Sequence, residues 1–370
     1  MSKKNLMVVI GTRPEAIKLA PVVQAIERSD WARCTLVLTG QHRDLVQPIV
    51  DQFGLNVTHD LRAMQPNQSL AKVTSRILHG LDELLELAQP HAVFGQGDTV
   101  SVLAASMASF FRHIPFAHVE AGLRTGNPQL PFPEEMNRVL TARMSTWHFA
   151  PTNVARDNLL AEGYDPATIW VTGNTVIDAL QCVVNQPPPA ELPLREGREF
   201  ILVTAHRREN HGEAMGRICA AIRALAAHHP ELDFVFPVHP NPAVRATTHQ
   251  MLSDLDNVRL IEPADYPVFC WLMKRARLIL CDSGGVQEEA PALGKPVLVL
   301  REETERPEAV TLGANQLVGT HTGHIIESVE ALLGNAQLYE RMASAGSPYG
   351  DGQASRRIID VVHNTLCRAD

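Results

Sequence analysis

Leu6-Met7-Val8-Val9-Ile10-Gly11-Thr12-Arg13-Pro14-Glu15 is the stretch that decides the fold. Its apolar run is typical of a buried strand, and Gly11 permits a sharp turn out of that strand. A helix is predicted from Pro14 toward Arg28, because proline suits the first helical position. The start of a helix carries unpaired N–H donors and a partial positive charge, so this turn suits a phosphate, and Arg13 would reinforce binding. The alternative is an ordinary strand-to-helix turn with a solvated arginine.

The same alternation of short β-branched runs and helix-length segments continues along the whole chain. It predicts an α/β protein built from doubly wound parallel sheets. We expect strands at residues 6–10, 35–39, 92–94, 116–119, 147–150, 169–172, 200–204, 234–238, 258–261, 278–281 and 297–300.

A proline-rich segment, 185–193, interrupts this alternation and indicates a domain junction, with the hinge near Gly173. We expect a first α/β domain at 1–172 and a second at 173–352, which the resemblance given below identifies as Rossmann-like. The apolar spacing near the C-terminus predicts a helix that packs back onto the first domain, in residues 353–370.

Composition narrows the function. The 370 residues carry a formal net charge of -8, which disfavours a nucleic-acid binder. The six cysteines show no C-x-x-C spacing and are expected to be reduced core residues. The apolar run at 6–10 is too short for a signal peptide, and the run at 100–111 is too short for a membrane span. We therefore expect a cytoplasmic protein that engages no membrane.

The third expected strand is followed by Gly95-Gln96-Gly97-Asp98-Thr99-Val100, which begins like a dinucleotide-binding loop. Val100 replaces the third glycine, and Asp98 would repel a pyrophosphate, so NAD binding is disfavoured. Open α/β sheets place ligands at the carboxyl ends of their strands. Asp98 is therefore a candidate catalytic carboxylate.

Two further carboxylates, Glu120 and Glu134, follow the next strand end in the chain. Together with Asp98 they could share one wall of a site and raise one another's pKa, which suits acid–base chemistry near neutral pH. The alternative for Glu134 is that it is an ordinary first-turn residue of a helix that begins after Pro133, with no role in chemistry.

The second half of the chain repeats the pattern of polar residues at strand ends. His206 and Arg207 close one strand, and His239 closes another. In the segment 282–289, Ser283 could cap a helix, two glycines could admit a phosphate, and Glu289 could accept ribose hydroxyls. Surface positions are the alternative for the histidines and arginines. No metal-binding spacing is present among the histidines, so no metal is expected.

These motifs together resemble the non-hydrolysing UDP-N-acetylglucosamine 2-epimerases. The matching stretches span almost the whole chain, at residues 11–21, 41–43, 97–99, 118–125, 133–138, 173–178, 206–210, 237–242, 282–293 and 304–310. The resemblance implies two Rossmann-like domains with a cleft between them, of the GT-B type, and a homodimer. It also implies interconversion of UDP-GlcNAc and UDP-ManNAc that supplies ManNAc for bacterial surface polysaccharides.

The chemistry fits the residues. The C2 hydrogen of GlcNAc is not next to a carbonyl, so its direct removal is difficult. One route oxidises a neighbouring carbon with a bound nicotinamide, for which the sequence shows no binding motif. The other route expels UDP from C1. Elimination would give 2-acetamidoglucal, and re-addition of UDP would give the epimer. No cofactor is expected.

By resemblance, the catalytic residues are Asp98, Glu120, Glu134 and His206, and the substrate-binding residues are Arg13, Arg138, Phe269, Ser283, Gly284, Gly285, Glu289 and Arg306. Phe269 is expected before a helix. Which carboxylate removes the proton and which returns one stays open.

Some members of the family are activated by UDP-GlcNAc at a second site, where Gln41, Glu134, Arg207 and His239 match. Asp44 stands where those members carry a glutamine, and residues 64–68 lack their arginine, which argues against activation. Rival activities are a 2-epimerase of a 2,3-diacetamido uronic acid nucleotide, a GT-B glycosyltransferase, a hydrolysing epimerase, and a sensor that binds without turnover.

Overall fold

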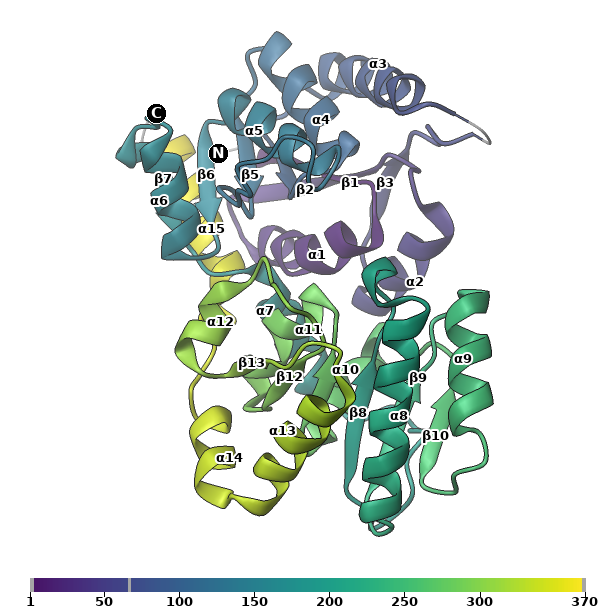
Figure 1. The fold of residues 1–370 in the computed structure, drawn as a ribbon. Helices are drawn as coiled ribbons and strands as arrows, with labels where there is room; N and C mark the ends of the chain where they lie inside the picture. The colour runs from purple at the N-terminus through teal and green to yellow at the C-terminus, as the bar shows by residue number, and fades with distance from the viewer. Residues whose placement is uncertain (1–2, 66–67, 368–370) are drawn as a thin grey trace. The chain divides into compact units, whose positions relative to one another are not determined.

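The computed structural model describes residues 3–65 and 68–367, without the side chain of Arg43. The chain divides into two compact units (Figure 1). Unit 1 comprises 1–179 and 349–370, and unit 2 comprises 180–348. The proline-rich segment 185–193 therefore lies inside unit 2. The domain limits expected at 172/173 and 352/353 stay a prediction. The part of the predicted C-terminal helix at 368–370 lies outside the described residues.

Unit 1 is a seven-stranded parallel sheet with the strand order β3-β2-β1-β4-β5-β6-β7. Figure 1 shows α1 on one side of these strands and α3 and α4 on the other. The elements of this unit are β1 (Lys4–Ile10), α1 (Arg13–Arg28), β2 (Ala32–Leu38), α2 (Arg43–Phe53), β3 (Val57–Asp60), α3 (Leu70–Ala88), β4 (Ala92–Gln96), α4 (Val100–Phe111), β5 (Phe116–Val119), α5 (Glu134–Met144), β6 (Trp147–Ala150), α6 (Asn153–Ala161), β7 (Ile169–Val171), the first part of α7 (Thr175–Val184), and α15 (Ala354–Cys367).

Unit 2 is a six-stranded parallel sheet with the order β10-β9-β8-β11-β12-β13. Its elements are the rest of α7, then β8 (Phe200–Thr204), α8 (Glu213–His228), β9 (Asp233–Pro237), α9 (Pro242–Leu252), β10 (Val258–Ile261), α10 (Tyr266–Arg275), β11 (Ile279–Cys281), α11 (Gly284–Glu289), β12 (Val297–Val299), α12 (Pro307–Leu312), β13 (Asn315–Leu317), α13 (Thr322–Gly334) and α14 (Ala336–Ala343). Short 3-10 turns lie at Pro166–Thr168, Arg208–Asn210 and Ala290–Leu293.

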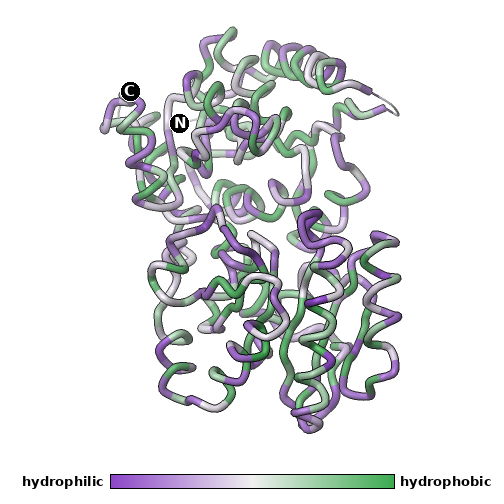
Figure 2. Tube along the Cα trace, in the orientation of Figure 1, coloured by the Kyte–Doolittle hydropathy of each residue, from purple (hydrophilic) through white to green (hydrophobic). Residues whose placement is uncertain are grey.

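Hydrophobic periodicity explains how each sheet is covered. On α3, Val73, Ile77, Leu81 and Leu85 recur every fourth residue, and all are buried in the core of unit 1. Figure 2 shows the result as helices that alternate between hydrophobic and hydrophilic positions along their length. The predicted fold class, α/β with two Rossmann-like doubly wound units, is confirmed.

Every strand that we expected is present, but β3 and β13 were missed. Both are edge strands, and most of their residues keep contact with solvent. A short edge strand needs an apolar side on one face only, so Val57-Thr58-His59-Asp60 shows no buried run.

The C-terminal helix α15 packs within unit 1. The Asp178 carboxylate accepts hydrogen bonds from the backbone N–H groups of Ala354 (3.1 Å) and Ser355 (2.8 Å), at the start of that helix. Near its end, the His363 ring lies 4.7 Å from the Trp31 ring, centroid to centroid. These contacts attach a segment from the far end of the chain to unit 1.

In each sheet the strand order reverses at one point: successive strands are added on one side of the first strand and then on the other. The loops at both reversal points carry predicted motifs. In unit 1 the change lies between β1 and β4, which are followed by Gly11 and by Gly97-Asp98. In unit 2 it lies between β8 and β11, which are followed by His206 and by Asp282. Ligands of doubly wound sheets bind at this kind of switch point, beyond the carboxyl ends of the strands.

Candidate functional site

The carboxylates of unit 1

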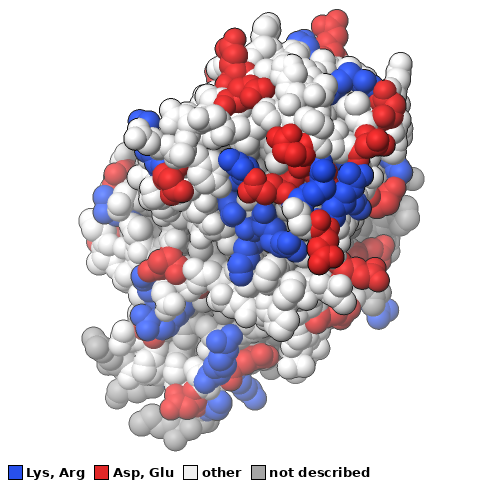
Figure 3. Space-filling view, turned by 90° about the horizontal axis from the view of Figure 1, so that it is seen from below, with Lys and Arg blue, Asp and Glu red and all other residues white. Residues whose placement is uncertain are grey.

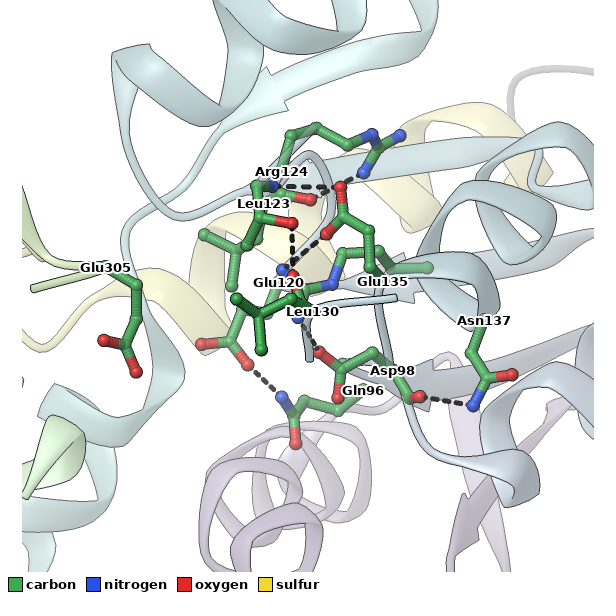
Figure 4. A network of polar contacts seen from close by, with 12 residues as sticks. Gln96, Asp98, Glu120, Leu123, Arg124, Leu130, Glu135, Asn137 and Glu305 are labelled. Carbon is green, nitrogen blue, oxygen red and sulfur yellow. Dashed lines mark hydrogen bonds and ion pairs between the residues drawn. The ribbon is translucent and has the colours of Figure 1, made fainter. Parts of the chain in front are cut away.

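Glu120 follows β5 and is held by three side chains of the same unit. Lys18 on α1 pairs with its Oε1 at 2.6 Å, and Asn174 donates to the same oxygen at 2.8 Å. Gln96, at the end of β4, donates to Oε2 (Figure 4). Glu120 is 8% exposed, and its backbone is in the left-handed region at φ 63°, which few non-glycine residues adopt. The surrounding contacts thus over-determine the position of this carboxylate.

Asp98 lies in the turn between β4 and α4. Its side chain is half-buried, and its Oδ2 pairs with the Arg138 guanidinium at 2.7 Å. Asn137 donates to its backbone carbonyl at 2.9 Å (Figure 4). Burial raises the pKa of Asp98, and Arg138 opposes that rise, while the charges of Glu120 and Glu134 add to it. The predicted trio is therefore brought together in one unit.

Glu134 and Glu135 begin α5, and they differ in their surroundings. Glu134 is half-buried, and its charge reaches Asp98. Glu135 is buried, accepts hydrogen bonds from the backbone N–H groups of Thr125 (2.9 Å) and Gly126 (3.0 Å), and approaches Arg138 at 3.3 Å. Glu135 thus ties the preceding loop to α5, a role that its place in the sequence did not reveal.

Two glycines near these carboxylates are required by geometry. Gly97 has φ +79° in the turn that carries Asp98. Gly122 has φ +89°, and a Cβ there would lie 2.1 Å from the backbone oxygen of Ala155 on α6. His118 on β5 is fully buried and donates from Nε2 to the Gly97 carbonyl at 2.8 Å, and burial lowers its pKa to about 3. A neutral imidazole therefore holds the Asp98 turn.

The turn after β1 requires a glycine at position 11 for another physical reason than the one we expected. Gly11 does not lie in the left-handed region; a Cβ at Gly11 would instead meet the Ser101 side chain on α4 at 2.1 Å. Glycine is needed there for close packing rather than for a sharp turn. Arg13 is the first residue of α1 and is half-buried. Glu15 is almost completely buried behind it and accepts from the N–H groups of Gly11 and Thr12.

The polar residues of unit 2

Asp282 is the centre of the second cluster and is fully buried. Its Oδ2 accepts from the backbone N–H groups of His206 and Arg207, both at 2.8 Å, and from the Asn210 side chain at 2.9 Å. Its Oδ1 lies 3.4 Å from the His206 Nδ1. This carboxylate joins the ends of β8 and β11 and fixes the loop that carries His206.

The His206 ring stacks on His239, with centroids 5.6 Å apart and an interplanar angle of 17°. Burial lowers the pKa of His206, His239 and Arg207 lower it further, and only the Asp282 charge raises it. The lowered pKa favours the neutral imidazole, and an anionic ligand beside it would favour its protonation.

The segment after β11 forms the short helix α11. The helix α11 covers only six residues. Ser283 is its N-cap residue, as expected, but the Ser283 hydroxyl makes no capping hydrogen bond. Instead the Ser283 backbone carbonyl accepts from the Gln287 backbone at 3.2 Å. A Cβ at Gly284 would lie 3.0 Å from the Arg306 guanidinium carbon. Gly284 therefore makes room for Arg306, and the expected approach of a phosphate to it stays a prediction.

Arg306 and Glu289 are each fixed by a neighbour. The buried Glu288 accepts from Arg306 Nε at 2.8 Å. The Tyr266 hydroxyl donates to Glu289 Oε2 at 2.9 Å. Phe269 lies within α10 and is half-buried, so the expectation that it precedes a helix is wrong. Asp265 caps α10 by accepting from the Val268 N–H at 3.0 Å.

The residues matched to a second site fall on both units. Gln41 accepts from the Ser101 hydroxyl at 2.8 Å and borders a hollow of about 450 Å³ in unit 1, lined by Gly40, Gln41, His42, Asp44, Leu45, Arg62 and Met64. Arg207 lies 3.3 Å from Glu305 within unit 2. In the segment 64–68, residues 66 and 67 lie outside the described part of the chain.

Within residues 3–65 and 68–367, no group of three or more His, Cys, Asp or Glu side chains is arranged to hold a metal ion. No helix in those ranges is long and apolar enough to cross a membrane. The cysteines form no disulfide. The face drawn in Figure 3 carries Lys and Arg side chains close to Asp and Glu side chains.

Several residues of these clusters escaped the sequence analysis: Glu15, Lys18, Gln96, Glu135, Asn174, Tyr266, Asp282 and Glu288. Some, such as Glu15 and Asp282, stand inside motifs that we singled out, which was an available signal. For Lys18 and Asn174 the role depends on contacts between segments far apart in the chain.

Comparison with known proteins

The fold and the clusters define an α/β protein of two Rossmann-like units, with carboxylates at the switch point of one sheet and a histidine–aspartate pair at that of the other. A family model described as UDP-N-acetylglucosamine 2-epimerase matches residues 24–363. The chain belongs to the UDP-N-acetylglucosamine 2-epimerase family.

Individual proteins with similar sequences and structures carry the same family name. The UDP-N-acetylglucosamine 2-epimerase of Escherichia coli K12 is 46% identical over 370 residues, covering 97% of this chain and 98% of the relative. The crystal structure of UDP-GlcNAc 2-epimerase from Neisseria meningitidis bound to UDP-GlcNAc is 44% identical, with a TM-score of 0.87 and 97% and 99% coverage. That of the Methanocaldococcus jannaschii enzyme with UDP-GlcNAc and UDP is 33% identical, with a TM-score of 0.78 and the same coverage.

Proposed function

We propose that this protein is a non-hydrolysing epimerase that interconverts UDP-GlcNAc and UDP-ManNAc. The observation that carries the proposal is the neighbourhood of Asp98, Glu120 and Glu134, in which burial and like charge raise the pKa of Asp98. A carboxyl group whose pKa is raised holds a proton more readily than an ordinary carboxylate and can still release it, as acid–base catalysis requires. The Neisseria relative that binds UDP-GlcNAc supports the choice of substrate.

The proposed reaction has two halves. In the first, one carboxylate removes the C2 proton, the C2–H electrons form a C1=C2 double bond, and the C1–O bond breaks with its electron pair passing to the diphosphate of UDP. In the second, a carboxylic acid returns a proton to the opposite face of C2, and the diphosphate oxygen re-forms the bond to C1. The atoms and electrons balance without a cofactor. Asp98, Glu120 and Glu134 are the proposed acid and base groups.

The proposed nucleotide contacts come from residues that are already fixed within their own unit. His206 faces Asp282 through Nδ1, which leaves Nε2 as the nitrogen for a phosphate oxygen. The pKa of His206 is lowered in the ligand-free protein. We expect the negative charge of a bound diphosphate to favour protonation of His206, and the protonated imidazole would assist the departure of UDP. Glu289 would accept the ribose hydroxyls, and Arg13, Arg138, Arg306, Ser283, Gly284, Gly285 and Phe269 are the other proposed substrate contacts.

Incubation with UDP-GlcNAc in D2O tests the proposal, with the C2 position followed by NMR. We expect deuterium at C2 and formation of UDP-ManNAc without added NAD, metal or acceptor. Free ManNAc with UDP would indicate a hydrolysing enzyme. Lack of exchange would refute the proposal for this substrate, and exchange with a 2,3-diacetamido uronic acid nucleotide alone would favour the modified-sugar alternative. A glycosyltransferase would require an acceptor, and a sensor would bind UDP-GlcNAc without exchange.

The same proposal extends to the setting of the enzyme. We propose a cytoplasmic homodimer that supplies ManNAc for surface polysaccharide, by analogy with the family. We further propose that initial rates depend hyperbolically on UDP-GlcNAc, because Asp44 replaces a glutamine of the activated members. A sigmoidal rate curve would contradict this, and would direct attention to Gln41, Arg207 and His239.

A further inference from the structure

Tyr266 and Glu289 form a buried hydrogen-bonded pair in unit 2. Tyr266 is the first residue of α10 and is 4% exposed, and Glu289 is the last residue of α11 and is 7% exposed. The phenol donates to Glu289 Oε2 at 2.9 Å. Because Asp265 caps α10 immediately before Tyr266, the start of the helix and the direction of the phenol are well defined.

The other oxygen of the same carboxylate, Oε1, lies beside Gly285. A Cβ at Gly285 would lie 3.5 Å from Oε1 and 4.0 Å from the Ser283 hydroxyl oxygen. Ser283 and Gly285 are half-buried, whereas the residues around them are buried. The space that the missing Gly285 side chain leaves is thus bordered by two oxygens that can contact hydroxyl groups.

We propose that Tyr266 is a positioning residue that orients Glu289 for the two ribose hydroxyls of a uridine nucleotide, and so sets the preference of the site for ribose over 2′-deoxyribose. This inference rests on the proposed function, in which Glu289 contacts the ribose. The phenol fixes one carboxylate oxygen, which determines where the other one points.

The chemistry of the pair supports this role. Burial raises the pKa of Tyr266 well above its usual value, and the Glu289 charge raises it further, so the phenol keeps its proton and acts as the donor. A ribose offers two neighbouring hydroxyl donors to the carboxylate. A site built to accept both discriminates strongly against an analogue that lacks one, because a buried charged acceptor is then left unpaired. That discrimination requires a carboxylate that cannot rotate away.

The test compares the binding of UDP and 2′-deoxy-UDP by calorimetry, in the wild type and in Tyr266→Phe. The variant keeps the buried ring and loses only the hydroxyl. We expect the affinity for UDP to fall about tenfold and that for 2′-deoxy-UDP to change less than threefold, so the ratio between them narrows. In turnover, KM for UDP-GlcNAc should rise while kcat stays near the wild-type value, because the ribose is remote from the reacting carbon.

Two further variants sharpen the result. Tyr339→Phe is the matched control, because Tyr339 is also in unit 2 and loses a hydroxyl bond of 2.7 Å to the Arg277 carbonyl, and it should leave the ratio unchanged. Glu289→Gln should narrow the ratio as Tyr266→Phe does, and the double variant should add little to either.

Equal loss of affinity for both nucleotides in Tyr266→Phe, or an unchanged ratio, would overturn the inference and leave the proposed function intact. A wild type that binds neither nucleotide would overturn the proposed function, and the inference with it.

Discussion

Glu15 provides a sharp test of how burial controls ionisation in unit 1. It is the third residue of α1 and is 1% exposed. Its carboxylate accepts from the N–H groups of Gly11 and Thr12 and from the Thr99 hydroxyl. Burial raises the pKa of Glu15 from 4.5 to about 7; the three hydrogen bonds oppose this rise, and the Asp98 charge adds to it.

The sign and size of the effect follow from linkage. An acid with a raised pKa in the folded state is more easily ionised in the unfolded chain, so the free energy of unfolding falls as pH rises from 4.5 and levels off above 7. Each pH unit between the two pKa values corresponds to about 1.4 kcal/mol. The full loss is therefore about 3 kcal/mol, of which about 2.5 kcal/mol falls between pH 5 and pH 8.5.

Glu15→Gln removes the ionisation and keeps the shape of the side chain. Denaturant unfolding of the ligand-free protein at pH 5 and pH 8.5 measures the difference in stability between variant and wild type. We expect this difference to shift by about 2.5 kcal/mol in favour of the variant as pH rises. Glu27→Gln is the matched control, because Glu27 lies on the same helix and is exposed, and it should follow the wild type at both pH values.

A difference between the wild type and Glu15→Gln that stays constant with pH would refute the reasoning, because Glu15 would then titrate alike in the folded and unfolded chains. NMR of ¹³C-labelled glutamate in the folded wild type gives an independent measurement. It should show a carboxyl group that titrates near pH 7.

Three other predictions concern the clusters directly. Asp98→Asn should lower kcat by at least about 100-fold and leave UDP binding within about threefold, whereas the same change at the exposed Asp157 should alter neither; collapse of UDP binding would mean that Asp98 has another role. His239→Ala should raise the pKa of His206, since His239 helps to lower it, and an imidazole NMR titration that moves downward would contradict the assignment. Gly122→Ala should lower the free energy of unfolding by about 3 kcal/mol or more. The control is Gly126→Ala, because Gly126 has a similar φ of +76° but no atom within 4 Å of an added Cβ, and it should cost about 1–2 kcal/mol. Equal losses of stability would show that crowding against Ala155 is not the cause of the effect at Gly122.

The alternation of apolar runs and helix-length segments was enough to predict both sheets, because a parallel strand that is buried on both faces must be apolar along its whole length. The edge strands β3 and β13 escaped for the same reason, since they are mostly half-buried or exposed. The sequence also placed Asp98, Glu120 and His206 at strand ends, where doubly wound sheets present functional residues.

What the sequence by itself determined is therefore the fold class, the family and the residues at the strand ends, because each of these depends on local patterns along the chain. Tertiary structure decided how these residues are held. Lys18 and Asn174 reach Glu120 from segments distant in sequence, and Asp282 fixes the loop of His206 from another strand. No local pattern encodes such contacts, because they arise only when folding brings helices, loops and strand ends from separate parts of the chain together.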